Sequence, residues 1–383
     1  MTAHPDPKHD DLADTPVAVP SAPPAGPGEP APGRRSLVRL VVSMLVALAL
    51  GAAVSLIHLP YAIMSPGPAV DVLGEQRSAD GSTVARIRVA GAPTYPTAGR
   101  LDFTTVRVRG GPGYAVNVVD VLAAWLAADQ DVYSVDELFP PQVTQEQVAQ
   151  ENRVEMTGSQ QVAAAVALRA VGYDVPLVLR VTRLVDGAPA TGQLQAGDVL
   201  VSIAGAPVAN AEGLRAAIAA VRAGDAVELV VRRGEAQVTV HPRTGTAPDG
   251  RTYVGIALAG DYRMPVEVTI DAGDVGGPSA GLMFALGIYD KLTDGALTGA
   301  ASVAGTGTID DGGAVGPIGG IAQKMAGARQ AGASVFLAPA GSCPEVRGRE
   351  PDGMTVVKVA TFAEARAALE AVGRSQTGAL ARC

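Results

Sequence analysis

One serine lies in a setting typical of a nucleophile. Ser279 belongs to the glycine-rich run GGPSAG at residues 276–281, and an apolar stretch, LMFAL at 282–286, follows at once. A turn of this kind that leads into a helix presents the serine hydroxyl at the start of the helix. A serine is a poor nucleophile until a neighbouring group takes its proton. The run therefore indicates a candidate nucleophile and requires a base elsewhere in the chain.

The choice of base is narrow. The chain has four histidines, and of these only His241 lies outside the first 60 residues. Lysines beyond the N-terminal tail are equally scarce, and they are Lys291, Lys324 and Lys358. Most isolated lysines are solvated surface charges. Lys324 is different because a Gly- and Pro-rich entrance at 316–320 and a helical pattern over 321–331 surround it.

Helical spacing places Lys324 on an apolar face. Ile321, Lys324, Ala328 and Ala331 fall on one side of the predicted helix, and Gln323 and Gln330 are predicted on the other side. A lysine held among Ile and Ala loses hydration, which lowers its pKa. Bringing that pKa into the range of a working base costs roughly 3 to 4 kcal/mol. The sequence thus predicts an inward-pointing lysine with a useful role.

Three runs taken together resemble the proteolytic domain of Lon-type Ser-Lys peptidases. They are GPSAG at 277–281, TGTI at 306–309 and VGPIGGIAQK at 315–324. The resemblance implies that Ser279 is the nucleophile, that Lys324 is the general base and that Thr306 helps to orient the lysine. An oxyanion hole is expected from backbone N–H groups at the turn, those of Ser279 and its neighbours, with Gly277, Pro278 and Ala280 as the turn residues.

The sequence departs from the Lon pattern at one point. An acidic residue is common three positions before the serine, and Gly276 stands there in this chain. Assistance from a carboxylate would then have to come from Asp271 or Asp274. By itself GGPSAG also fits a helix-capping turn or an anion-binding loop. No Walker-type phosphate cradle occurs, so we expect an ATP-independent protein with no cofactor and no metal.

Composition limits the possible partners. The chain has 383 residues, a net charge of −8 and an isoelectric point near 5.1, which argue for two or more domains and against nucleic-acid binding. Cys343 and Cys383 are its two cysteines. In an exported protein they are candidates for a disulfide, and two unpaired thiols are the alternative.

The N-terminal region predicts a membrane anchor. Residues 1–36 are rich in Pro and Ala and are expected to form a disordered cytoplasmic tail. A transmembrane helix is predicted over 37–59, because 40–57 is uncharged and Arg34, Arg35 and Arg39 precede it. This charge bias places the rest of the chain outside the cytoplasm, with the anchor crossing the membrane once. A cleaved signal peptide and a buried core helix are the alternatives.

A second module lies at residues 172–244. Short β-like runs at 177–184, 199–203, 227–232 and 236–240, with a helical stretch at 211–221, carry motifs at 187–190 and 194–205 that resemble a bacterial PDZ domain. Such modules bind extended peptides at a sheet edge. The resemblance places the peptide-binding loop at Gly172, Tyr173, Asp174 and Val175.

The PDZ-like module is predicted to be inserted into the peptidase domain. Too few residues separate it from Ser279 for the sheet that a Lon-type domain needs, so strands are expected upstream, at 85–89 and 99–108, followed by a helix over 116–128. The peptidase domain would then consist of 60–171 and 245–383. The fold class is α+β. The layout resembles the membrane-anchored, PDZ-containing Lon-like serine proteases of Gram-positive bacteria, including the actinobacterial type.

Two functions follow from these observations. The preferred one is a membrane-anchored serine endopeptidase that cleaves extracytoplasmic proteins or peptides, with the PDZ-like module selecting substrates or regulating cleavage. The alternative is a non-catalytic, membrane-tethered adaptor that keeps a degenerate peptidase fold as a scaffold. Peptide binding without turnover would indicate the adaptor.

Overall fold

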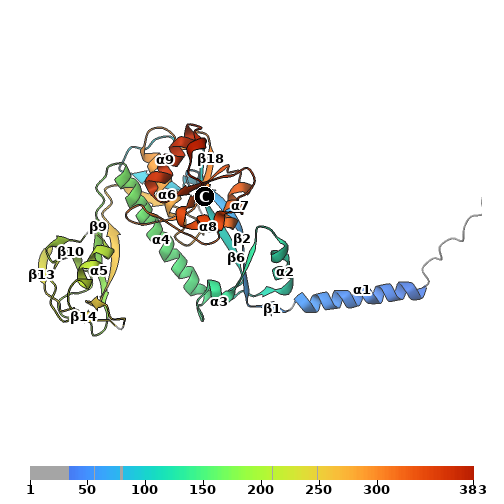
Figure 1. Ribbon diagram of the computed structural model, residues 1–383, viewed down its shortest axis with the longest axis horizontal. Helices are drawn as coiled ribbons and strands as arrows, with labels where there is room; N and C mark the ends of the chain where they lie inside the picture. The colour runs from blue at the N-terminus through green and yellow to red at the C-terminus, as the bar shows by residue number, and fades with distance from the viewer. Residues whose placement is uncertain (1–33, 56, 78–80, 209, 248) are drawn as a thin grey trace, which may run out of the picture. The chain divides into compact units, whose positions relative to one another are not determined.

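The computed structural model describes residues 34–55, 57–77, 81–208, 210–247 and 249–383 (Figure 1). The predicted disordered tail over 1–36 lies outside these residues up to position 33. The chain forms two compact units, 1–56 and 57–383, and each is described by itself.

The described part of the first unit is one helix, α1 (Arg34–Ser55), 22 residues long. None of the helices within the described ranges has both the length and the apolar character needed to cross a membrane. The spanning helix predicted over 37–59 therefore gains no support from the structure, although a helix does occupy most of this segment.

A six-stranded sheet organises the second unit. Its strand order is β22 (Thr355–Val359), β21 (Val335–Pro339), β18 (Ser302–Gly305), β6 (Arg100–Arg109), β2 (Tyr61–Asp71) and β8 (Asp131–Ser134). The first four strands run parallel, and β2 is antiparallel to both of its neighbours. Strands from before and after the PDZ-like segment thus share one sheet.

Helices cover both faces of this sheet. In β21, Val335 and Leu337 pack in the core that contains α6 (Gly281–Leu292), whereas Phe336 packs with α7 (Ile321–Gln330) on the other side. This alternation follows from the two-residue side-chain period of a strand. The core on the α6 side also takes in α4 (Gln145–Ala170), the long green helix in Figure 1, and α9 (Phe362–Gly373).

The predicted upstream strands have counterparts close to their expected bounds. The run at 99–108 corresponds to β6, and the run at 85–89 overlaps β5 (Ile87–Ala90), which pairs with β17 (Glu267–Ile270). The helix expected over 116–128 is shorter, α2 (Val118–Leu126). It follows β7 (Val116–Asn117), whose partner is β1 (His58–Leu59).

A second six-stranded sheet has its own core. Its order is β13 (Ala236–Val240), β12 (Leu229–Arg233), β10 (Val199–Ile203), β9 (Leu177–Leu184) and β16 (Ile256–Tyr262), with β11 (Ala206–Pro207) on β10 and α5 (Ala211–Ala219) beside it. Because β16 pairs with β9 along its whole length, this sheet extends to residue 262, beyond the module limit predicted at 244.

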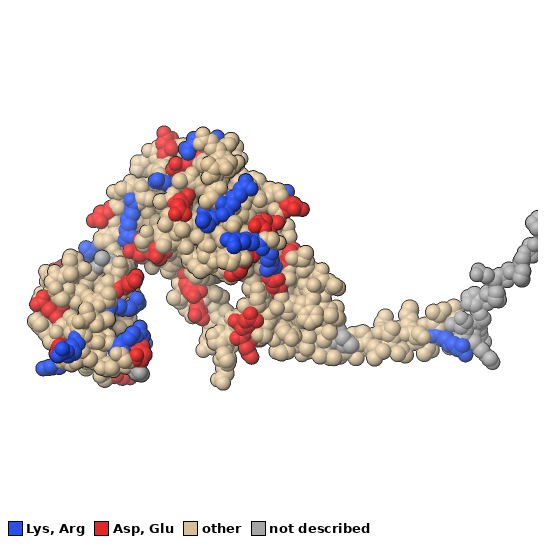
Figure 2. Space-filling view, viewed as in Figure 1, with Lys and Arg blue, Asp and Glu red and all other residues tan. Residues whose placement is uncertain are grey.

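The remaining elements are short. They are β3 (Glu75–Arg77), β4 (Thr83–Ala85), α3 (Val135–Leu138), β14 (Gly245–Thr246), β15 (Thr252–Tyr253), β19 (Thr308–Ile309), β20 (Val315–Gly316), η1 (Ala340–Ser342), α8 (Cys343–Val346) and η2 (Thr377–Ala379). On the face shown in Figure 2, acidic and basic side chains are interspersed.

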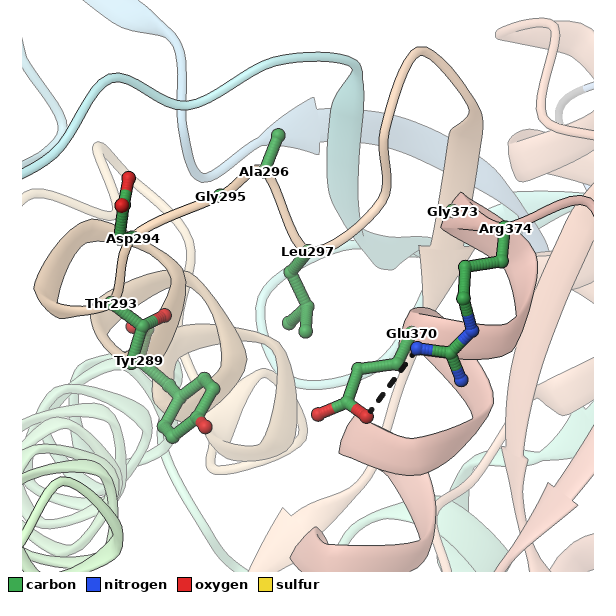
Figure 3. Close-up of a pocket in the computed structure, with 9 residues that line it drawn as sticks. All are labelled: Tyr289, Thr293, Asp294, Gly295, Ala296, Leu297, Glu370, Gly373 and Arg374. Carbon is green, nitrogen blue, oxygen red and sulfur yellow. Dashed lines mark hydrogen bonds and ion pairs between the residues drawn. The ribbon is translucent and has the colours of Figure 1, made fainter.

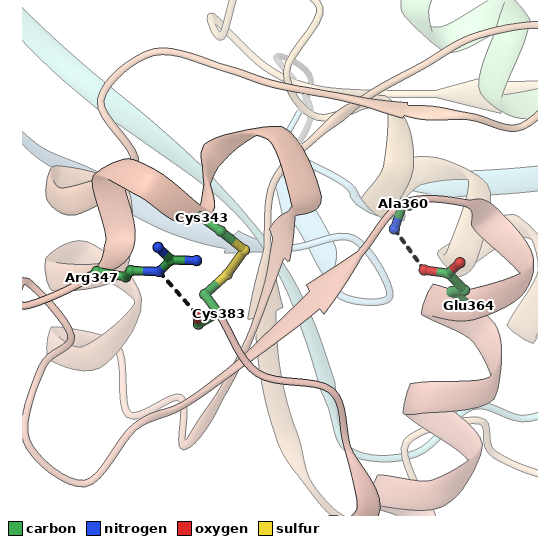
Figure 4. The surroundings of a disulfide bond; sticks show 5 residues. All are labelled: Cys343, Arg347, Ala360, Glu364 and Cys383. Atoms are coloured by element: carbon green, nitrogen blue, oxygen red, sulfur yellow. Dashed lines mark hydrogen bonds between the residues drawn. A yellow bond between two sulfur atoms is a disulfide. The ribbon is translucent and has the colours of Figure 1, made fainter.

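A disulfide joins Cys343, at the start of α8, to Cys383 (Figure 4). The bond links residues 40 positions apart. A loop of this length implies a stabilisation of roughly 4 kcal/mol in the chain-entropy account. Arg347 Nε adds a hydrogen bond to the Cys383 carbonyl oxygen at 3.3 Å, so this bridge holds the segment that follows α9 against α8.

Candidate active site

The structure brings the three residues singled out in the sequence into one cluster. The Nζ atom of Lys324 lies 3.0 Å from the Oγ atom of Ser279 and 3.2 Å from the Oγ1 atom of Thr306. Thr306 Oγ1 in turn donates to the carbonyl oxygen of Ser279 at 3.0 Å. The amine therefore contacts both hydroxyls, and the threonine hydroxyl also bonds to the serine backbone.

Ser279 is held by the segment that follows β18. The N–H of Gly307 donates to the Ser279 carbonyl at 2.8 Å, and the Leu282 N–H donates back to the Gly307 carbonyl at 3.1 Å. Gly277 has a φ of +84°, a conformation that favours glycine and allows the tight turn before α6. The backbone around Ser279 is therefore held by the hydrogen bond to its carbonyl and by the turn at Gly277.

Lys324 is placed by the start of α7. The cap residue Gly320 has a φ of +68°, and a Cβ there would lie 2.6 Å from Met64 Sδ and 2.8 Å from Val106 Cγ1. Only glycine lets the helix begin this close to the β2–β6 pair. The Lys324 N–H then donates to the Gly320 carbonyl at 3.0 Å, which fixes the first turn.

Burial sets the protonation state of the lysine. The side chain is 3 % exposed, and this desolvation lowers the pKa of Lys324 from 10.5 to about 8. Among the ion pairs formed by the described residues, none includes Lys324. Because no carboxylate restores the charged form, a far larger fraction of this amine is neutral and able to accept a proton near pH 8 than in a solvated lysine.

The predicted faces of this helix need one correction. Gln323, expected on the solvent side, is 1 % exposed, and Ala331, expected inside, is exposed. Gln323 is tolerated inside because its Nε2 atom donates to Asp131 Oδ2 at 2.8 Å. Arg349 contacts both oxygens of Asp131, at 2.9 and 3.0 Å. The hydrogen bonds from Arg349 and Gln323 outweigh the effect of burial and lower the pKa of Asp131.

The other candidate bases and acids lie apart from the pair. His241 follows β13, with its Nε2 atom 3.7 Å from Glu228. Asp271 accepts hydrogen bonds from Gln76 and from the Gly273 N–H. Asp274 lines the cleft that contains Ser279 but forms no ion pair with Lys324 among the described residues. Within the described ranges, Lys324 is the base in contact with Ser279.

The predicted oxyanion donors are only partly suitable. The Gly277 N–H is engaged with the Asn152 carbonyl at 2.9 Å, and Pro278 has no N–H. The N–H groups of Ser279 and Ala280 make no hydrogen bond with the described parts of the chain. Of the three predicted turn residues only Ala280 can therefore donate, and the serine's own N–H joins it.

Helix α4 supports the turn, which the sequence reading missed. Ser159 Oγ donates to the Pro278 carbonyl at 2.9 Å, in addition to the bond between Asn152 and Gly277. A Cβ at Gly276 would lie 2.7 Å from Asn152 Cβ, and one at Gly281 would lie 2.6 Å from Ser159 Oγ. The glycines of GGPSAG thus allow the close approach of α4. A single sequence carries no signal for this contact.

A cleft of about 630 Å³ opens onto Ser279 and Lys324. Its polar lining includes Glu151, Asn152 and Asp274. Its apolar lining comes from Met64, Val106, Val108, Leu138, Phe139 and Val143. A mostly apolar cleft with few polar groups is typical of a ligand site, and this one has room for a peptide segment.

The PDZ-like sheet carries a groove of its own, about 610 Å³ in volume. It lies between α5 and the chain around β16, which ends the strand order and so leaves one edge open to an extended peptide. Apolar residues line it, among them Leu214, Ile218, Val254 and Ile256.

The residues predicted as the peptide-binding loop, Gly172, Tyr173, Asp174 and Val175, lie between α4 and β9. None of these residues lines the groove. Val175 is 1 % exposed and packs with Leu168 and Val266, where α4 leads into β9. The groove beside β16, a strand beyond the predicted module limit, is therefore a second candidate for the peptide site.

Another pocket, of about 320 Å³, lies between the end of α6 and α9 (Figure 3). Leu297 projects into it, and Glu370 and Arg374 form an ion pair at 4.0 Å on its α9 side. It shares no lining residue with the Ser279 cleft. In the portion of the chain described, no group of three His, Cys, Asp or Glu side chains is placed to hold a metal ion.

Two family models match the chain. Residues 153–241 match the PDZ domain, and residues 261–352 match the Lon protease (S16) C-terminal proteolytic domain. The second match includes Ser279, Thr306 and Lys324. The chain therefore combines a PDZ domain with a Lon-type proteolytic domain, and this supports a serine peptidase with a PDZ module in a mixed α/β fold.

Solved PDZ domains resemble one part of the chain. That of an SdrC-like protein from Listeria monocytogenes is 23% identical, covers 21% of this chain and 86% of its own, and has a TM-score of 0.21. Its counterpart from Listeria innocua is 22% identical, with coverages of 21% and 92% and a TM-score of 0.21. A Geobacillus thermodenitrificans structure is 25% identical, with coverages of 20% and 92% and a TM-score of 0.19. No match was found among curated proteins.

Replacing Ser159 tests the support from α4. Ser159→Ala removes the hydrogen bond to Pro278 and should lower kcat for cleavage of an unfolded polypeptide roughly 5- to 10-fold, the rate equivalent of one hydrogen bond of about 1 kcal/mol. KM should change little, because the residue positions the nucleophile and does not touch substrate. Thr157→Ala is the matched control, since Thr157 Oγ1 bonds only to its own helix, at Arg153. Equal kcat values for Ser159→Ala and the unchanged protein would contradict the positioning role.

Proposed function

We propose that this protein is an endopeptidase in which Ser279 and Lys324 form a catalytic dyad. The observation that carries the proposal is the contact of 3.0 Å between a serine hydroxyl and an amine that is almost fully buried. The match to a Lon-type proteolytic domain supports the same reaction class.

The reaction begins when Ser279 Oγ attacks the carbonyl carbon of a peptide bond. Lys324 Nζ takes the hydroxyl proton, and negative charge develops on the carbonyl oxygen. The N–H groups of Ala280 and Ser279, at the positive end of α6, stabilise that oxyanion. When the C–N bond breaks, Lys324 returns the proton to the leaving amine, and an acyl-enzyme ester remains on the serine.

Water completes the cycle. The neutral lysine takes a proton from a water molecule, whose oxygen attacks the ester carbon, and the proton then passes to Ser279 Oγ as the acid product leaves. Thr306 keeps the amine aimed at the serine, since its hydroxyl contacts Lys324 Nζ and the Ser279 carbonyl together. Acyl transfer of this kind needs neither a nucleotide nor another cofactor, so we propose that cleavage is independent of ATP.

The PDZ domain is proposed to select substrates or to regulate their cleavage. An extended peptide would add to the open edge of β16 and place apolar side chains in the groove beside α5. The suitable substrates are unfolded proteins or peptides, because only an extended segment can pair with that edge.

Two substitutions test the dyad. In Ser279→Ala and in Lys324→Met, turnover of an unfolded polypeptide should fall by about 10³-fold or more, as expected when one member of a catalytic unit is removed. Lys291→Met is the matched control, because Lys291 lies in the last turn of α6 and should leave the rate unchanged. Circular dichroism shows whether each variant is folded. A folded variant of Ser279 or Lys324 that cleaves at the original rate would reject the mechanism.

We propose further that the N-terminal segment anchors the protein in a membrane, with residues after it on the extracytoplasmic side. The support is the uncharged run at 40–57 and the arginines at its N-terminal flank, Arg34, Arg35 and Arg39. The disulfide between Cys343 and Cys383 agrees with an oxidising compartment.

Protease treatment of intact cells tests this location. An added protease should degrade residues after 57 without cell lysis, since they are exposed outside the membrane, while a tag fused before residue 33 stays protected. A cytoplasmic protein of the same cells is the control for lysis. Protection of the catalytic segment until the cells are broken would contradict the proposed location.

A further inference from the structure

Helix α2 has an apolar face that the described part of the structure leaves half or more exposed. Val119 is 52% exposed, Leu122 50%, Trp125 64% and Leu126 90%. Val119, Leu122 and Leu126 follow three- and four-residue spacing, so they lie on one side of the helix, with Trp125 at its border. A contiguous face of this kind on a soluble domain marks an interaction site.

The face belongs to a helix that is held firmly in place. Val121 and Ala124, on the opposite side, are 2% and 1% exposed and pack with Ile63 and Val116. Asn117 and Asp120 form a reciprocal capping box at the first turn. The exposed residues therefore belong to a helix whose opposite side is packed into the second unit.

The residues around the face match the chemistry of a lipid surface. Trp and Tyr favour the boundary between hydrocarbon and water, and Tyr114, just before β7, is 63% exposed. On the neighbouring strand β6, Arg107 and Arg109 are exposed, and Arg109 approaches Asp120 of α2 at 3.8 Å. The Arg109 guanidinium is paired with Asp120, whereas the exposed guanidinium of Arg107 on the same strand is a group of the kind that attracts anionic headgroups.

The position of α2 in the fold favours lipid over a protein partner. The strand before α2 pairs with β1, where Asn117 lies opposite His58. His58 follows Ser55, the last residue of α1, by three positions, and three residues of extended chain span at most about 11 Å. If the preceding segment is anchored in a membrane, covalent geometry alone keeps the start of α2 near the surface of that membrane.

We propose that α2 is an interfacial helix that inserts Leu122, Trp125 and Leu126 into the headgroup region of a bilayer. The inference rests on the proposed membrane location and is independent of the catalytic mechanism. The opposite face of a free interfacial helix is covered by water. In this protein the core covers the opposite face of α2. Insertion of α2 would therefore fix the second unit on the lipid surface.

The chain contains one tryptophan, and it lies in this face. Trp125 fluorescence therefore reports on α2 without labelling. The full chain is reconstituted into vesicles of phosphatidylcholine and phosphatidylglycerol, with and without brominated acyl chains. Emission should shift to shorter wavelength on reconstitution and should lose most of its intensity in brominated vesicles, because bromine quenches only by contact.

Substitutions test whether the exposed residues of α2 are responsible for the contact between Trp125 and lipid. The double variant Leu122→Ser and Leu126→Ser keeps Trp125 and should abolish most of the quenching, while Ser279-dependent cleavage of an unfolded polypeptide stays unchanged. Val154→Ser is the matched control, since Val154 is 61% exposed on α4 and lies outside the face. It should leave the quenching as it is.

Three results would overturn the proposal. Vesicles that float with the chain but do not quench Trp125 would leave the anchor intact and reject docking of α2. A chain that does not float with vesicles at all would reject both. A shift to shorter wavelength that depends on protein concentration and occurs without lipid would show that a second copy occupies the face. Cleavage by the unchanged protein, measured in parallel, reports on the dyad separately from each of these results.

Discussion

The desolvation of one amine is the constraint on which the proposed chemistry depends. Moving the pKa of Lys324 from 10.5 to about 8 corresponds to roughly 3 kcal/mol that the fold must supply. The sign follows from proton binding. Between about pH 8 and 10.5 the unfolded chain binds more protons at this residue than the folded chain, so stability rises with pH across that window. Below it the penalty is present in full, and the α7 core must offset it.

The layered sheet explains why the serine and the lysine meet. Ser279 precedes α6 on one face of the sheet, and Lys324 lies in α7, which packs on the other face. Thr306 comes directly after β18, a strand between parallel neighbours, and contacts both residues. The pair thus assembles at the carboxyl end of a parallel strand, where open α/β sheets commonly place their ligand sites. Helix α4 completes the arrangement because it supports the turn from behind.

Sequence reasoning succeeded where the chemistry lies in local runs. The turn at 276–281 and the helix entrance at 316–320 each contain their own positioning glycines, and the resemblance of these runs to Lon-type peptidases implies the contact found between Ser279 and Lys324. It failed where the position of a residue depends on a contact partner far away in the sequence. Gln323 was assigned to solvent, yet its partner Asp131 lies 192 positions away. Ser159 and Pro278 are 119 positions apart, and no periodicity in either segment indicates their bond. The PDZ sheet extends beyond the predicted limit at 244 for the same reason, since β16 follows a loop that breaks the strand pattern.

Direct titration of Lys324 tests the central claim most directly. The chain has only four lysines, so an NMR titration of the protein labelled at lysine resolves each side chain, and Lys324→Met identifies the signal. We expect a pKa of about 8 in the folded protein, because burial without a carboxylate partner disfavours the charged amine. A value near 10.5 in the folded protein would show that the amine is hydrated and charged, and would contradict its role as the general base.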